Sequence, residues 1–236
     1  MLAIFKREFR SYFTGVVGYV FLVVFLAMAA AVFCFTTLFS MSSNVTSYFV
    51  VMLLFSAIVL PLLTMKSFSE ERKLKTEQLV LTSPVSLTGM VIGKFLAAYA
   101  MFAMALVFTS LYFLLLIPYA ITFKAAVLFG NIIALLLVGA VFISIGLFVS
   151  SLTENQLSAA VGTIAIIFAF LVVGLLSSLI PASYDIRYVL DSLSIFSRFN
   201  AFTAGYFDWS AIIFYVTLGA LFLYLTVRVY DRRRYN

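Results

Sequence analysis

The stretch AAVLFGNIIALLLVGAVFISIGLFVSSL, residues 125–152, contains no charged side chain and a single amide, that of Asn131. It exceeds the ~20 apolar residues that an α-helix needs to cross a bilayer. Lipid offers no hydrogen bonds to the backbone, so a membrane-spanning segment of this kind must satisfy its polar groups within a helix. The stretch therefore predicts an α-helical membrane protein.

The composition extends this prediction to the whole chain. Of its 236 residues, 65% are hydrophobic and 10% are charged, whereas a soluble domain carries about 25% charged residues. The net charge of +6 lies at the ends of apolar runs, which is typical of membrane topology and not of a nucleic-acid-binding face. The absence of histidine excludes His-based metal sites and His general bases. The single cysteine, Cys34, lies in the first apolar run, where we expect an inert thiol.

Apolar runs long enough to span a bilayer predict six transmembrane helices. Their expected limits are 16–39, 48–65, 87–117, 125–152, 157–180 and 210–229. The third run is longer than a bilayer requires, so we expect its start, with Lys94, to protrude into water. The first run resembles a signal peptide at its start, but it continues to Phe39, which favours a helix that is retained.

The distribution of Lys and Arg predicts the orientation. Six spans place both termini on one side, and that side would hold all fifteen basic residues except Lys124, Arg187 and Arg198. Because basic segments stay in the cytoplasm, we expect both termini there. The expected location is the plasma membrane, which is the inner membrane of a bacterium.

The N-terminal sequence MLAIFKREFRSYF, residues 1–13, places Leu2, Phe5 and Phe9 on one helical face. Residues 1–15 therefore predict an amphipathic helix in the inner interface, with its cations near anionic headgroups. The alternative is a simple charged flank of the first span. The cations of this interfacial helix are Lys6, Arg7 and Arg10.

The charged sequence EERKLKTEQLVLTSP, residues 70–84, separates the second and third apolar runs. Ser67 and Glu70 have the spacing of a capping box, strong helix formers follow, and Pro84 ends the pattern. We predict a cytosolic coupling helix within 67–84, formed mainly by residues 70–81, that a soluble partner pushes; a solvated loop is the alternative. The expected contact residues are Glu70, Glu71, Arg72, Lys73, Lys75, Thr76 and Glu77.

Two further connections bear on function. Glu154, Asn155 and Gln156 join the fourth and fifth spans, either as a second contact for the same partner or as a tight polar turn. Residues 181–209 alternate aromatic side chains with scattered charges. They predict one or two short helices that lie at the outer surface or re-enter the membrane.

The sequence lacks the residues of an energy-converting site. GMVIGKF, residues 89–95, has three residues between its glycines instead of four, and Phe95 replaces the magnesium-binding Ser or Thr of a phosphate-binding loop. The spans carry almost no charges, so no ion relay is visible. We therefore expect no cofactor in this chain, an external energy source and an apolar pathway suited to a lipidic or amphiphilic cargo. A two-fold pair would supply enough helices for such a pathway.

The arrangement resembles the membrane subunit of an ABC-2 type transporter over essentially the whole chain. Coupling segments of that family often contain Glu-Arg, Gly-Thr-x-Glu, Pro and Gly-Lys. The corresponding residues here are Glu71-Arg72, Thr76 and Glu77 (adjacent, with Lys75 in place of the glycine), Pro84, and Gly93-Lys94. SSLTENQ (150–156) and LTVRVYDRRR (225–234) look most like the subgroup associated with gliding motility and copper-enzyme maturation.

This resemblance implies an all-α integral membrane protein with an N-terminal interfacial helix (1–15) and a six-span domain (16–236). That domain would include the coupling helix (67–84) and outer re-entrant helices (181–209). It also implies a separate cytosolic ABC ATPase that binds ATP and Mg²⁺, a second permease protomer and contact with membrane lipids, but no nucleic acid. The expected function is an ATP-driven exporter's permease. The alternatives are a non-transporting mechanical anchor for an ABC ATPase and a self-powered channel or secondary transporter.

Overall fold

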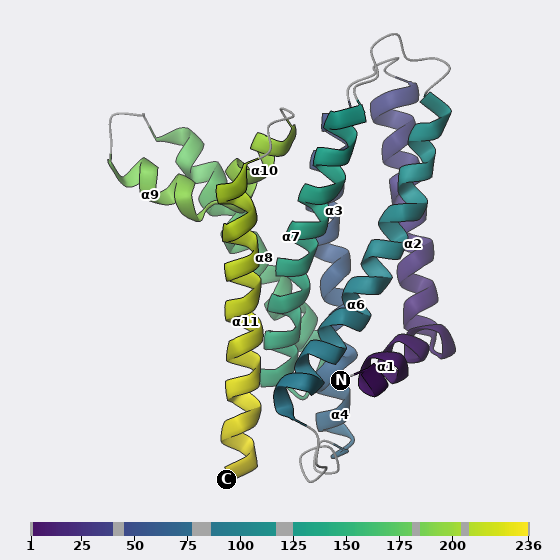
Figure 1. Ribbon diagram of the computed structural model, residues 1–236, viewed down its shortest axis with the longest axis vertical. Helices are drawn as coiled ribbons and strands as arrows, with labels where there is room; N and C mark the ends of the chain where they lie inside the picture. The colour runs from purple at the N-terminus through teal and green to yellow at the C-terminus, as the bar shows by residue number, and fades with distance from the viewer. Residues whose placement is uncertain are drawn as a thin grey trace.

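The computed structural model describes residues 2–39, 45–76, 86–116, 125–180, 185–203 and 208–235. Within these ranges six helices are long and apolar enough to cross a membrane, as the sequence predicts (Figure 1). They are α2 (Val16–Phe33), α3 (Thr46–Thr64), α6 (Leu87–Ser110), α7 (Ala125–Leu152), α8 (Gln156–Leu179) and α11 (Trp209–Tyr235). Helix α2 continues as a π-helical segment (Cys34–Leu38), and α6 continues as a 3₁₀ segment (Leu111–Leu116). The chain is an all-α integral membrane protein.

Helix α7 forms the centre of the bundle and contacts α3, α6, α8 and α11. In its most apolar window 67% of the residues are buried, against 22% in α11, so α11 leaves most of its surface to lipid. Glycines allow the close approach: a Cβ added at Gly139 would lie 2.0 Å from Phe102 of α6, and one at Gly146 would lie 2.1 Å from the Thr64 hydroxyl of α3. Small residues at such crossings let membrane helices pack closely.

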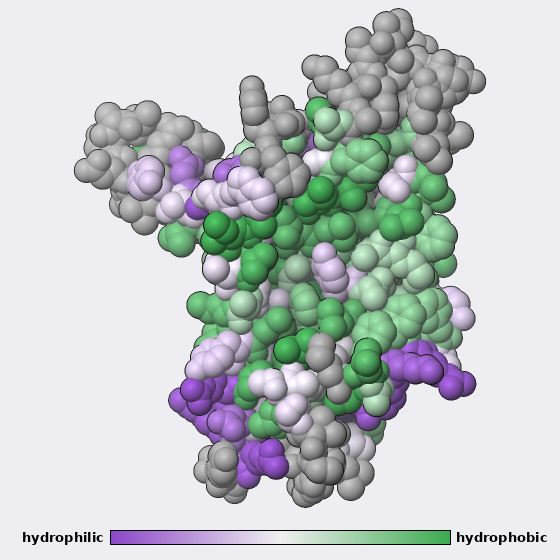
Figure 2. Space-filling view, viewed as in Figure 1, coloured by the Kyte–Doolittle hydropathy of each residue, from purple (hydrophilic) through white to green (hydrophobic). Residues whose placement is uncertain are grey.

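Four short helices lie at the two ends of the bundle. At the end that carries both termini, α1 (Leu2–Thr14) lies across the long helices and α4 (Lys66–Lys73) extends α3 (Figure 1). At the opposite end lie α9 (Asp185–Leu193) and α10 (Ile195–Thr203), which fall within the predicted 181–209 segment. Figure 2 shows an apolar band across the middle of the visible face of the bundle, with hydrophilic side chains gathered near the two ends of that face.

Arg198 joins the short helices α9 and α10 to α11. Its guanidinium donates to the Ser192 carbonyl at 3.0 and 3.2 Å and to the Ser210 hydroxyl at 2.9 Å, and it lies 4.5 Å from the centre of the Phe214 ring. The Tyr215 hydroxyl of α11 donates to the Ile195 carbonyl at 2.8 Å. These bonds hold the α9–α10 pair against the end of the last span.

The predicted capping box at residues 67–70 is wrong. Only Met65 separates α3 from α4, so Ser67 lies inside a helical turn, and the start of α4 has no side-chain cap. The reason is that the apolar span runs almost directly into the charged helix. The amide groups that a cap would satisfy are bonded instead to Ser150, which comes from a distant part of the chain.

A single helix over residues 70–81 is also wrong, because α4 ends at Lys73 and residues 74–76 form a turn. The Thr76 amide donates to the Glu71 carbonyl and the Lys75 amide to the Arg72 carbonyl, both at 3.0 Å. This pair of bonds, with Lys75 at a φ of 55°, is a Schellman motif. The motif ends the helix, and the remainder of the predicted coupling helix, including Glu77, lies outside the described residues.

Candidate functional site

The most charged region of the structure lies at the end of the bundle where α1, α4 and the start of α6 meet. Lys94 of α6 is only 2% exposed, so the prediction that it protrudes into water is wrong. Helix α1 packs against α6, and its side chains Ile4, Phe9, Tyr12 and Phe13 lie half-buried against the hydrophobic core. Part of the apolar face of α1 therefore contacts protein and covers the Lys94 side chain.

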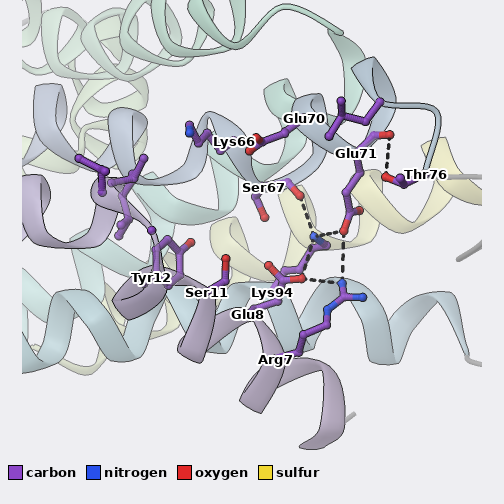
Figure 3. A pocket seen from close by; sticks show the side chains of 15 residues that line it. Arg7, Glu8, Ser11, Tyr12, Lys66, Ser67, Glu70, Glu71, Thr76 and Lys94 are labelled. Atoms are coloured by element: carbon purple, nitrogen blue, oxygen red, sulfur yellow. Dashed lines mark hydrogen bonds and ion pairs between the residues drawn. The ribbon is translucent and has the colours of Figure 1, made fainter.

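Lys94 uses its three ammonium protons on three acceptors from two other elements (Figure 3). The Nζ atom lies 2.9 Å from Glu71 Oε1 of α4, 3.3 Å from Glu8 Oε1 of α1 and 2.7 Å from the Ser67 carbonyl. It also lies 5.0 Å from the centre of the Phe68 ring. A buried charge is tolerated only when its donors are satisfied in this way. Lys94 of α6 therefore joins α1 to α4.

Arg7 completes the network from its solvent side. Its Nη2 atom lies 2.7 Å from Glu8 Oε1 and 3.3 Å from Glu71 Oε1, and its side chain is 59% exposed. The hydrogen bond to Glu8 raises the pKa of the Arg7 guanidinium above its ordinary value. Two cations thus share two carboxylates, and the cluster has no net charge. We call Arg7, Glu8, Glu71 and Lys94 the α1–α4–α6 cluster.

Ser150 connects the junction of α3 and α4 to α7. Its hydroxyl accepts hydrogen bonds from the amides of Phe68 and Ser69 and donates to the Met65 carbonyl, each at 3.1 Å. The first turn of any helix leaves its amide groups without partners inside the helix. Because one buried hydroxyl satisfies two of these amides and a carbonyl, α4 is fixed to α7 at the point where α3 ends.

Two arginines bind the last turn of α7. Arg72 of α4 donates to the Leu152 carbonyl at 2.8 Å and lies 3.0 Å from the Glu154 carboxylate, and Arg233 of α11 donates to the Ser151 carbonyl at 2.6 Å. The final carbonyls of a helix have no partner within it and carry its negative dipole, so cations stabilise them. Arg72 therefore joins α4 to the α7–α8 connection, and Arg233 joins α11 to the same turn of α7.

The structure brings some of the predicted site residues together and leaves others apart. Glu71, Arg72, Glu154 and Arg7 form ion pairs that link α4 to its neighbours. The Oδ1 atom of Asn155 accepts a hydrogen bond from the Leu157 amide at 3.0 Å, so Asn155 caps the start of α8. Capping explains an asparagine at this position without any contact to a partner protein. The other predicted site residues that the structure describes form no ion pair between elements. They are Lys6 and Arg10 on α1, Glu70 and Lys73 on α4, Lys75 and Thr76 in the turn, and Gln156 at the start of α8.

Sequence reasoning missed Glu8, Ser150 and Arg233 and placed Lys94 in the wrong environment. Two features of the sequence indicate the ion pair between Glu8 and Lys94. Glu8 is the only acidic residue before Glu70, and Lys94 is the only charged residue in the third apolar run. A lone carboxylate in a basic helix and a lone cation in an apolar run are each costly when unpaired. Ser150 carried no such signal, because serine is common in spans.

A cavity of about 600 Å³ lies between α1, α4 and α6, and the α1–α4–α6 cluster forms part of its wall (Figure 3). Burial raises the pKa of the Tyr12 hydroxyl, which also lines the cavity, so this phenol stays protonated. No group of metal-binding side chains occurs among the residues that the structure describes. The arrangement is suited to holding four elements in one geometry and to transmitting a displacement of α4 to the others.

Most of the chain matches a known protein family. A family model described as "ABC-2 family transporter protein" matches residues 33–228, which is more than half of the chain. The matched region contains α4, the start of α6 and the α7–α8 connection, whereas α1 precedes it. The comparison with curated proteins found no match.

Proposed function

Because the chain belongs to the ABC-2 family of transporter proteins, we propose that it is the permease of an ATP-driven exporter, powered by a separate ABC ATPase. Such permeases are membrane transport subunits and in general work with an ABC ATPase and as dimers. In our proposal ATP and Mg²⁺ are bound by the ATPase in the cytoplasm, and a second protomer completes the pathway. The narrower resemblance to the motility and copper-enzyme-maturation subgroup stays a prediction.

The observation that carries the proposal is the set of bonds around α4. Helix α4 is short, charged and located at the end of the bundle, yet it is fixed to α1 and α6 by ion pairs, to α7 by Ser150 and to the α7–α8 connection by Arg72. A load on the exposed face of α4 therefore reaches four other elements without deforming a flexible loop. We propose that the ATPase applies this load at Lys73, Lys75 and Thr76, which are exposed.

The proposed orientation places α1, α4 and the C-terminal end of α11 in the cytoplasm of the cell. Basic residues on α1, on α4 and at the end of α11 support it, because such residues remain on the cytoplasmic side of membrane proteins. The proposed cargo is lipidic or amphiphilic. Apolar and aromatic side chains dominate the spans, and a pathway between two protomers would have a wall of this kind.

The orientation is tested with Thr76→Cys in a Cys34→Ser background, which removes the only native cysteine. We expect a membrane-impermeant maleimide to modify this cysteine from the cytoplasmic face alone. Modification from the exterior face alone would contradict the proposal, because the ATPase could not then reach α4.

Coupling is tested in proteoliposomes that contain the chain and the ATPase that co-purifies with it. Lys73→Glu reverses an exposed charge on α4 that makes no bond with the described residues. We expect it to leave ATP hydrolysis in place and to abolish the movement of labelled lipid, whereas Asn200→Lys on α10, at the opposite end, changes neither. Normal transport by Lys73→Glu would contradict the α4 contact. Hydrolysis without movement of any lipid by the wild type would favour the mechanical anchor, and ion-driven flux without ATPase would favour a self-powered channel.

A further inference from the structure

The cavity between α1, α4 and α6 has a balanced set of charges in its wall. Its volume of about 600 Å³ lies within the range of small-molecule sites, roughly 300–1,000 Å³. Three cations and three carboxylates line it: Arg7, Lys66, Lys94, Glu8, Glu70 and Glu71. A site with this balance offers no net attraction to an anion or a cation, but it can bind a group that carries both charges.

Two of these side chains form no ion pair with the described part of the chain. Four of the six charges form the α1–α4–α6 cluster, and they neutralise one another. The other two, Lys66 and Glu70, lie one turn apart on α4, are half-buried, and form no ion pair with any residue that the structure describes. With respect to the described residues, the cavity therefore has one ammonium and one carboxylate available in its wall.

An apolar groove adjoins the cavity. It has a volume of about 190 Å³ and lies between α2 and α3. Its wall consists of Val16, Val17, Val20, Phe21 and Val24 from α2, Val59 and Leu62 from α3, and Met65 from the junction with α4. Val16 and Val17 belong to the wall of both the cavity and the groove. A charged cavity thus lies next to an apolar groove between two membrane-spanning helices.

We propose that the cavity and groove together bind one glycerophospholipid whose headgroup carries a phosphate and a primary ammonium, as phosphatidylethanolamine does. The phosphate pairs with the ammonium of Lys66, the headgroup amine donates to the carboxylate of Glu70, and an acyl chain lies in the groove. Amphipathic helices such as α1 lie at the depth of lipid headgroups, so the cavity faces the correct layer of the bilayer.

The balance of charge decides between the classes of lipid. An anionic headgroup would leave Glu70 without a partner beside a negative charge, which is unfavourable at a half-buried site. A choline headgroup carries a quaternary ammonium that has no proton to donate to Glu70. A primary ammonium satisfies Glu70 through charge-assisted hydrogen bonds, which are the stronger kind. This site does not depend on the cargo or direction of transport, because it requires only the geometry of α1 to α4.

The test is native mass spectrometry of the full-length chain in mild detergent, titrated with phosphatidylethanolamine, phosphatidylcholine or phosphatidylglycerol of the same acyl chains. We expect phosphatidylethanolamine to bind at one site about tenfold more tightly than the other two, a difference of ~1.4 kcal/mol. Glu70→Gln should remove the preference over phosphatidylcholine, and Lys66→Gln should weaken binding of both about tenfold.

Matched variants separate the groove from the general lipid surface. Val24→Trp fills the groove and should abolish binding, whereas Val23→Trp, on the neighbouring exposed position outside the groove, should leave it unchanged. Lys73→Gln is the corresponding control for the headgroup, since Lys73 is exposed on α4 and does not line the cavity.

Four results would overturn the proposal. The first is equal binding of all three lipids, and the second is equal loss in the test and control variants. The third is that soluble phosphoethanolamine binds as tightly as the lipid does and that Val24→Trp leaves this binding unchanged. The ligand would then be a free phosphate compound and not a lipid. The fourth is absence of bound phosphatidylethanolamine from the chain purified together with its ATPase in mild detergent.

Discussion

Replacing Lys94 by Met removes the central cation of the α1–α4–α6 cluster and keeps most of the side-chain volume. The Lys94 side chain is 2% exposed, and its ammonium forms ion pairs at 2.9 and 3.3 Å and a hydrogen bond at 2.7 Å. Removing one partner of a fully buried ion pair costs about 3–5 kcal/mol. Here the carboxylates of Glu8 and Glu71 keep 18% and 21% exposure and retain Arg7, so solvent and Arg7 offset part of the loss.

We therefore expect Lys94→Met to lower the free energy of unfolding by about 2–3 kcal/mol. The assay is reversible unfolding in mixed detergent micelles, followed by circular dichroism, with hydrogen exchange of α1 as a local measurement. Exchange in α1 should accelerate, because its bond to α6 through Glu8 is lost. The matched control is Lys73→Met, an exposed lysine of α4, which should change stability by less than about 0.5 kcal/mol.

A double-mutant cycle distinguishes the ion pair from a change in packing. Lys94→Met combined with Glu71→Gln should destabilise the chain by less than the sum of the single variants, with a coupling energy of about 1.5–3 kcal/mol. A second cycle combines Arg7→Gln with Glu71→Gln. Its coupling energy should be less than about 1 kcal/mol, since the Arg7 side chain is 59% exposed. Additive losses for Lys94 and Glu71, or a stability of Lys94→Met equal to that of the wild type, would refute the reasoning.

Three further variants test the geometry around α4 and α7 by the same unfolding assay. Ser150→Ala should cost about 1–3 kcal/mol, because two amides and a carbonyl at the α3–α4 junction lose their partner; an unchanged midpoint would exclude this role. Lys75→Gly should raise stability by about 0.5–1 kcal/mol because glycine tolerates a φ of 55°, and a loss of stability would contradict the assigned helix end. Gly146→Ala should cost about 1–3 kcal/mol and be partly rescued by Thr64→Ala, while Gly219→Ala, whose Cβ would meet its nearest neighbour at 3.5 Å, should be near neutral.

The six spans could be predicted because their signal is local. A run such as residues 125–152 has the length and apolarity of a span, and the helix found there has the same limits. The last span is longer than predicted, because α11 continues to Tyr235 through its basic end. The exposed arginines there did not stop the helix, since the last turn of a helix favours cations and Arg233 binds the end of α7.

The site was less predictable, because it depends on pairs that are far apart in the sequence. The charge pattern identified Glu71 and Arg72, but not their partners. Lys94 and Glu8 are separated by 86 positions, and Ser150 and Phe68 by 82. The family pattern has a glycine where this chain has Lys75, and only the left-handed φ of Lys75 shows why a glycine suits this position.

The sequence by itself determined the solvent, the number of spans and the short helix at the N-terminus, because the energy of placing each segment in lipid or water depends on its own side chains. Only the tertiary structure decided which charges are buried and where α4 begins and ends. It also placed a cavity, whose wall has one cation and one carboxylate without an ion pair among the described residues, next to an apolar groove. The physical reason is that the cost of a buried charge is set by its partners, and the partners of Lys94 come from helices that meet only when the bundle folds.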